Sequence, residues 1–130
     1  MYNSTTSNVS VSVEPKYLDH ESAPDKNIYV WSYTVRIENM GEETVQLRAR
    51  HWKITDAFGR LQEVHGPGVV GEQPVLKPGE SFEYTSGTPL ATSSGIMSGT
   101  YSMQTPGGRL FDVDIPAFSL DTPQARRQIN

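Results

Sequence analysis

The feature that most constrains the fold is an unbroken alternation of side-chain types between Tyr29 and Glu38. The odd positions are all aromatic or β-branched: Tyr29, Trp31, Tyr33, Val35 and Ile37. Four of the five even positions are polar or charged. A period of two over this length predicts a β-strand with one buried face, because a helix would repeat about every 3.6 residues. We expect the apolar face of this strand to line the core.

Shorter alternations of the same kind lie on both sides of this strand. They occur at residues 9–13, 45–49, 52–54, 82–84, 101–103 and 111–115, and residues 61–64 are expected to begin a return strand after a hairpin turn at residues 56–59. Turn-forming residues separate them, and no segment carries a helical pattern. About 7–8 short antiparallel strands joined by turns predict an all-β fold, namely a β-sandwich with both tryptophans in its core.

Several local features refine this layout. The apolar phase changes between Ala49 and Trp52, which predicts a β-bulge near Arg50 and His51. A second change of phase predicts another bulge at Pro116. Pro15 is expected to end regular pairing or to lie at a sheet edge, and residues 86–95 are expected to form a loop.

Length and composition bound the class of protein. The chain has 130 residues, which is typical of one domain. We predict a flexible N-terminus at residues 1–6, the domain at 7–120 and a flexible tail at 121–130. A net charge of −4 indicates no general affinity for nucleic acid, and the absence of cysteine excludes disulfides and thiol catalysis.

The sequence predicts no targeting signal of the two kinds considered. The N-terminus has neither a basic segment nor an apolar core, so no secretory signal is predicted. No apolar run approaches the roughly 20 residues of a membrane span. A cytoplasmic protein with no membrane partner is therefore expected, and the sequence leaves both a monomer and a homodimer open.

A glycine-rich stretch contains the one G-x-G-x-x-G pattern of the chain, at Gly66, Gly68 and Gly71. In dinucleotide-binding folds this pattern opens a helix whose N–H groups face a pyrophosphate. Here Pro74 and another strand follow, so that mechanism is not predicted. A backbone nest that binds phosphate remains an alternative to a purely structural loop.

Side chains near this stretch supply further candidates. Arg50, His51 and His65 would add donors to a phosphate nest, but solvated strand faces and a bulge histidine bonded to backbone are the favoured explanation. Val69 and Val70 lie between the glycines, either exposed as a contact for a partner or buried against the domain.

Catalysis and metal binding are not expected. The chain has no G-x-S-x-G and no H-E-x-x-H pattern, so no catalytic residue is predicted. Asp112 and Asp114 would make a weak magnesium site. His51 and His65 would suit cobalt only if the fold brought them together. We therefore predict no metal site and no cofactor.

Several segments, taken in order, resemble the bacterial ApaG family, also called CorD. They are Val13-Glu14-Pro15, Tyr29-Val30-Trp31-Ser32-Tyr33, Arg50-His51-Trp52, His65-Gly66-Pro67-Gly68-Val69-Val70-Gly71, Gln73-Pro74, Lys77-Pro78-Gly79-Glu80 and Gly99-Thr100-Tyr101-Ser102-Met103. The resemblance spans roughly residues 7–120, and it implies a fibronectin type III-like sandwich.

The resemblance also carries functional expectations. It implies a link to cobalt and magnesium resistance and a genomic association with diadenosine tetraphosphate metabolism. Related domains occur in eukaryotic F-box proteins and in a protein that binds a DNA polymerase subunit. These relations imply a non-catalytic module that binds an unidentified protein partner. The alternative is binding of phosphate, pyrophosphate or a dinucleoside polyphosphate through residues 66–71.

Overall fold

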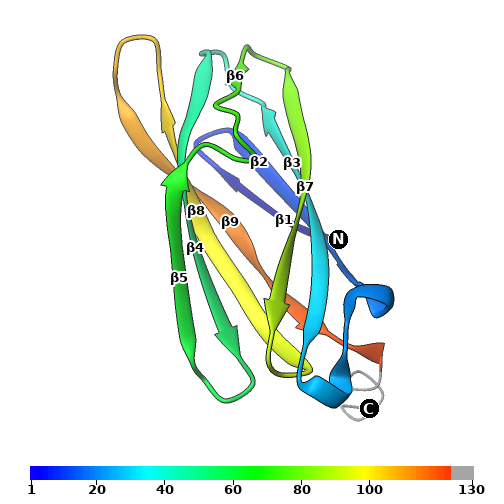
Figure 1. The fold of residues 1–130 in the computed structure, drawn as a ribbon. Helices are drawn as coiled ribbons and strands as arrows, with labels where there is room; N and C mark the ends of the chain where they lie inside the picture. The colour runs from blue at the N-terminus through cyan, green and yellow to red at the C-terminus, as the bar shows by residue number, and fades with distance from the viewer. Residues whose placement is uncertain (124–130) are drawn as a thin grey trace.

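The computed structural model describes residues 1–123, which form two stacked antiparallel sheets (Figure 1). The first sheet has the order β1 (Tyr2–Thr6), β2 (Val9–Tyr17), β3 (Tyr29–Asn39) and β7 (Ser81–Leu90). The second has the order β5 (Leu61–Pro67), β4 (Val45–Asp56), β8 (Ser94–Gln104) and β9 (Leu110–Asp121), and β6 (Val75–Leu76) pairs with β4. Two short 3-10 turns, η1 (Asp19–Glu21) and η2 (Pro24–Lys26), connect β2 to β3. The predicted all-β, fibronectin type III-like sandwich is confirmed.

The core lies between the sheets and is centred on aromatic residues. Both tryptophans are buried, as predicted, with exposed fractions of 1% for Trp31 and 3% for Trp52. The Trp52 ring meets Tyr33 edge-on at 5.2 Å and Phe118 at 6.0 Å between ring centroids. Trp31 Nε1 donates a hydrogen bond to the backbone oxygen of Asp121, 3.0 Å away, so its one polar atom is satisfied.

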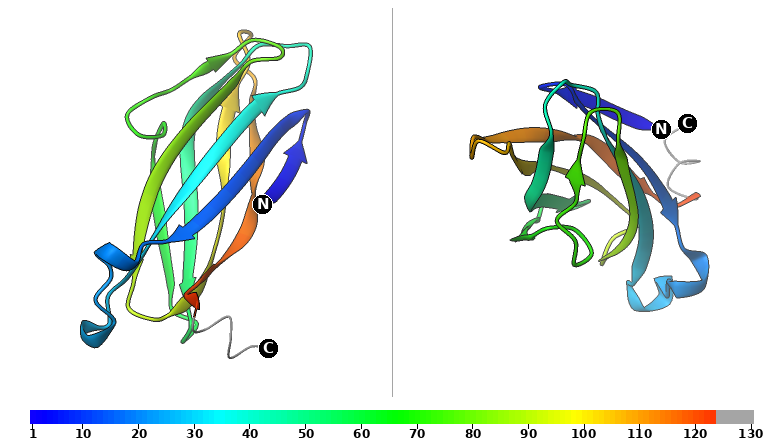
Figure 2. Two further views of the ribbon diagram at one scale, coloured as in Figure 1. Left: turned by 90° about the vertical axis from the view of Figure 1, so that its right-hand side faces the viewer. Right: turned by 90° about the horizontal axis from the view of Figure 1, so that it is seen from above.

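One side of the sandwich is closed by the N-terminal strand. Figure 2 shows β1 running beside β9, and Tyr2 and Ser119 share a hydrogen bond of 3.0 Å between their hydroxyl groups. Residues 2–6, which belong to the predicted flexible N-terminus, form this paired strand. Ser7 and Asn8 both have positive φ and form a two-residue turn that folds β1 back onto β2.

Two further expectations about loops need correction. Residues 86–95 were expected to form a loop, but β7 continues to Leu90 and β8 begins at Ser94, so only a short turn remains. Thr88 is buried in this extension. The tail was expected from Asp121, yet Asp121 ends β9 and Thr122 is also buried. Residues 124–130 of the predicted tail lie outside the described residues.

Of the two predicted β-bulges, one lies where the sequence predicted it and the other is displaced. In β4 the register shifts between Leu47 and Ala49, so the irregularity falls at Arg48 and not near Arg50 and His51. The next large apolar side chain after Leu47 is Trp52. The change of phase therefore becomes visible in the sequence only after the bulge, and the bulge was predicted too far along the strand. The second bulge is confirmed, because Met97 pairs with Phe118 while Gly99 pairs with Ile115, leaving Pro116 in the irregular segment.

The other side of the sandwich is open. β5 and β7 are the last strands of their sheets, and the ladder partners of both lie on one flank only. In the part of the chain that the structure describes, no helix is long and apolar enough to cross a membrane. The open side is where the fold leaves a groove.

Candidate functional site

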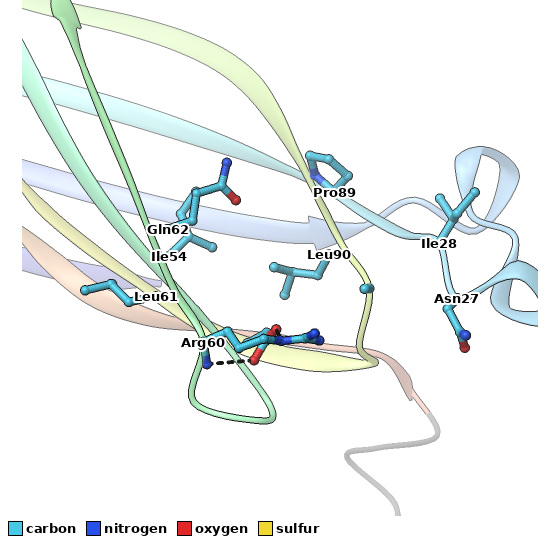
Figure 3. A pocket seen from close by; sticks show the side chains of 10 residues that line it. Asn27, Ile28, Ile54, Arg60, Leu61, Gln62, Pro89 and Leu90 are labelled. Atoms are coloured by element: carbon cyan, nitrogen blue, oxygen red, sulfur yellow. Dashed lines mark hydrogen bonds and ion pairs between the residues drawn. The ribbon is translucent and has the colours of Figure 1, made fainter.

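An elongated groove runs between the edge strands β5 and β7. The part near the turn between β4 and β5 has a volume of about 410 Å³. It is lined by Leu61 and Gln62 on one wall and by Pro89 and Leu90 on the other (Figure 3). Ile28, from the loop before β3, closes its far end. These walls are largely apolar, which is a common property of ligand-binding clefts.

A second hollow extends the same groove toward the glycine-rich loop. It has a volume of about 270 Å³ and shares Ile54, Gln62 and Pro89 with the first hollow. It adds Arg50 and Gly87 to the lining. We call the two hollows together the β5–β7 groove.

The turn that joins β4 to β5 lies at one end of the groove and is held by several hydrogen bonds. The Asp56 carboxylate accepts hydrogen bonds from the backbone N–H groups of Phe58 (2.9 Å) and Arg60 (3.0 Å). It also accepts one from Arg60 Nε at 2.7 Å. Desolvation acts to raise the pKa of Asp56, but these hydrogen bonds outweigh it and hold the pKa below its ordinary value. The turn therefore sets the register of the β4–β5 hairpin.

The glycine-rich loop caps the opposite end, and the structure separates its two valines. Val69 has an exposed fraction of 1% and belongs to the core, whereas Val70 is 56% exposed. The hypothesis of an exposed valine pair is thus wrong for Val69, because the backbone turns back on itself there. Val69 and Glu72 exchange two backbone hydrogen bonds of 2.8 Å, and Val70 and Gly71 between them both have positive φ.

Arg50 holds this loop rather than standing free beside it. Its Nη1 donates to the backbone oxygens of Pro67 (3.0 Å) and Gly68 (2.9 Å). A Cβ atom at Gly66 would lie 2.9 Å from Nη1, so the glycine leaves room for the guanidinium group. The loop therefore presents carbonyl oxygens to a cation, which is the opposite of an anion nest.

Three N–H groups of the loop donate hydrogen bonds within the protein. Gly68 donates to the backbone oxygen of Arg48 at 2.9 Å, and the Val69 and Glu72 N–H groups bond within the turn. No helix follows the glycines among the described residues. Phosphate binding through Gly66, Gly68 and Gly71 stays a prediction with no contact in this geometry to favour it.

The fold does bring the two histidines together. His51 and His65 are direct partners in the β4–β5 ladder, and their rings stack with centroids 3.9 Å apart. His51 Nε2 also forms a 2.9 Å hydrogen bond with Glu63 Oε1, and this bond holds the pKa of Glu63 below its ordinary value. Sequence reasoning missed Glu63, although its spacing of two from His65 places both side chains on one strand face.

A tyrosine pair joins the two sheets inside the core. The Tyr84 and Tyr101 hydroxyl groups form a hydrogen bond, and both residues are buried. Burial is the main cause that raises the pKa of each phenol above its ordinary value. The pair belongs to the hydrophobic core and links the two sheets there.

Known proteins resemble this chain along its whole length. A family model described as the ApaG domain matches residues 19–105. Proteins named ApaG from Parvibaculum lavamentivorans and Rhodospirillum centenum are each 62% identical over 130 residues, which is 100% of both chains. The crystal structure of an ApaA candidate from Bordetella pertussis is 51% identical, with a TM-score of 0.86 over 89% of this chain and 94% of that chain.

Proposed function

The chain belongs to the ApaG family, and on this premise we propose that it is a non-catalytic module that binds a protein partner. The partner contributes an extended segment, which lies in the β5–β7 groove. The groove between two edge strands is the single observation that carries the proposal.

The edge strands supply the backbone part of such binding. Each strand of a sheet alternates its hydrogen-bonding groups, and the outer groups of an edge strand have no ladder partner. An extended segment of another protein can add to such an edge through its own backbone. β1 seals the opposite side of the sandwich, so among the strands of residues 1–123 the open pair of edges is β5 and β7.

The apolar side chains of the groove would determine which extended segments bind. Leu61 is 57% exposed, and with Ile28 and Leu90 it offers an apolar surface to alternate side chains of the segment. The expected partner sequence is therefore an extended stretch with apolar residues at every second position.

The charged groups of the groove support binding rather than catalysis. Asp56 and Arg60 are paired with each other, and Arg50 is bonded to the carbonyl oxygens of the loop. A general acid or base needs a titratable group directed at a substrate. The groove side chains that can carry charge are instead used to hold the turn and the loop.

The test is a selection from a displayed library of random peptides with the purified protein as bait. Leu61→Asp should weaken binding of the selected peptides at least about tenfold, because a charge replaces an apolar side chain that the bound segment would cover. The matched control is Leu110→Asp on β9, since Leu110 is 63% exposed and lies away from the groove. Both variants should keep the far-ultraviolet spectrum of the native sheet. Equal loss in both variants, or no loss in either, would refute the groove as the site.

A further inference from the structure

We propose that His51, Glu63 and His65 bind a divalent transition-metal ion on the outer face of the β4–β5 hairpin. Their ligand atoms all lie within 4.8 Å of one another. Within residues 1–123, they form the one group of three or more histidine and acidic side chains that meets this spacing. The groove lies on the other face, because Trp52 and Val64, the neighbouring ladder pair, point inward.

The distances are close to those of a metal site. Zinc binds imidazole nitrogen at about 2.0–2.1 Å and carboxylate oxygen at about 2.0–2.2 Å, so tetrahedral ligand atoms lie about 3.4 Å apart. His51 Nε2 and Glu63 Oε1 are 2.9 Å apart, near this value. His65 must turn its ring to point a nitrogen at the same position, and its exposure leaves that rotation free of core packing.

The backbone under these side chains is fixed. His51 and His65 are opposite each other in a continuous antiparallel ladder from Ala49–Pro67 to Thr55–Leu61. The Asp56 turn at one end and the Arg50 contacts at the other hold this register. Binding therefore requires side-chain rotation only, which keeps the entropic cost of assembling the site small.

The surroundings leave room for a further ligand. A hollow of about 420 Å³ adjoins His51 and is lined by Lys53, Thr100 and Asp114 among others. Three protein ligands leave at least one coordination position for water or another donor, as in open zinc sites. The hollow gives access to that position from solvent.

The ligand set selects the class of ion. Two imidazoles with one carboxylate suit zinc, nickel or copper, whereas magnesium and calcium prefer oxygen ligands alone. Lys53 is the ladder partner of Glu63 and places a competing positive charge beside the carboxylate. This charge should lower the affinity for a cation, although Glu63 can still act as a ligand.

The test is calorimetric titration of the full, tag-free chain with zinc chloride. We expect saturable binding of one ion per chain, and His65→Ala should lower the affinity at least about tenfold, as the loss of supporting contacts alone already does at metal sites. The matched control is His20→Ala, which removes the third histidine of the chain from η1 and should leave the affinity unchanged. Glu63→Gln keeps an oxygen but loses the charge, and should also weaken binding.

A second measurement locates the ion without any variant. Nickel added to the labelled wild-type protein should broaden the amide signals of residues 51 and 63–65 before those of residue 20. Absence of saturable heat up to about 1 mM zinc would overturn the proposal, since any affinity would then be weaker than millimolar. Equal loss in His20→Ala would do the same, and full affinity in Glu63→Gln would overturn the three-ligand assignment.

Discussion

Each glycine of residues 66–71 meets a different local requirement. Gly66 makes room for the Arg50 guanidinium, and a Cβ at Gly68 would lie 2.2 Å from the backbone oxygen of Glu72. Gly71 has open space around it and needs only its positive φ of 81°. The G-x-G-x-x-G pattern therefore follows from one side-chain contact, one backbone contact and one turn, without a nucleotide.

The contrast between two of these glycines predicts unequal costs. Gly71→Ala should lose about 1–2 kcal/mol of unfolding free energy, which is the cost of a left-handed alanine. Gly68→Ala should lose clearly more, because its Cβ also collides with backbone that has no flexible end to move. Urea denaturation of both variants measures the difference. Equal losses would show that the contact with Glu72 relaxes freely.

Val70 is the strained residue of the loop. Its φ of 44° is unfavourable for a β-branched side chain, and it occupies a turn position that prefers asparagine followed by glycine. Val70→Asn gives the turn the asparagine–glycine sequence that it favours. The substitution should raise the unfolding free energy by about 1 kcal/mol. Val75→Asn, at a similarly exposed valine in β6, should give no such gain. An unchanged or lower denaturation midpoint for Val70→Asn would contradict the strain.

At the scale of elements, alternation predicts β3 well and β1 not at all. β3 buries Trp31, Val35 and Ile37 on one face, so its sequence carries the period. β1 consists mainly of polar residues that face solvent or the edge of β9, and its pairing depends on the turn at Ser7 and Asn8. A strand held by a turn and a few hydrogen bonds leaves little apolar signal.

The site depends on pairings that the sequence does not state. The groove exists because two edges from different sheets face each other, which requires the whole strand order. The His51–His65 contact requires the hairpin register, which the Asp56 turn sets. The residue types were visible in the sequence, whereas the contacts between them were not.

The role of β1 can be tested by deletion of residues 1–6. This removes the Tyr2–Ser119 hydrogen bond and the bond that Thr6 Oγ1 accepts from the Asp114 N–H. The unfolding free energy should fall by about 1 kcal/mol or more, the net worth of a hydrogen bond. Deletion also opens β2 as an edge, so dimers or aggregates should increase in sedimentation measurements. Unchanged stability and size would mean that β1 is dispensable.

At the scale of the whole molecule, the buried tyrosine pair predicts instability in alkali. The folded-state pKa values of Tyr84 and Tyr101 lie above the unfolded-state value of about 10, so the folded protein holds more protons above that pH. Stability should be constant up to about pH 10 and then fall by up to about 1.4 kcal/mol per pH unit for each tyrosine. Urea denaturation between about pH 8 and pH 11 measures this slope.

The matched control for that prediction is the double variant Tyr84→Phe with Tyr101→Phe. It removes both titrating groups together and leaves no buried hydroxyl unpaired, so the neutral-pH stability should change little. The alkaline slope should become shallower. The same slope in the wild type and the double variant would assign alkaline unfolding to other groups.

Binding of a partner's extended segment between β5 and β7 can be tested on the wild-type protein. The most direct measurement is an amide chemical-shift titration of the labelled protein with a peptide selected by it. Such binding predicts saturating shifts at residues 61, 62 and 64 and at residues 87–90, which line the two walls of the groove. Shifts confined to the turn at residues 69–72, or to the outer face of β8 and β9, would contradict it.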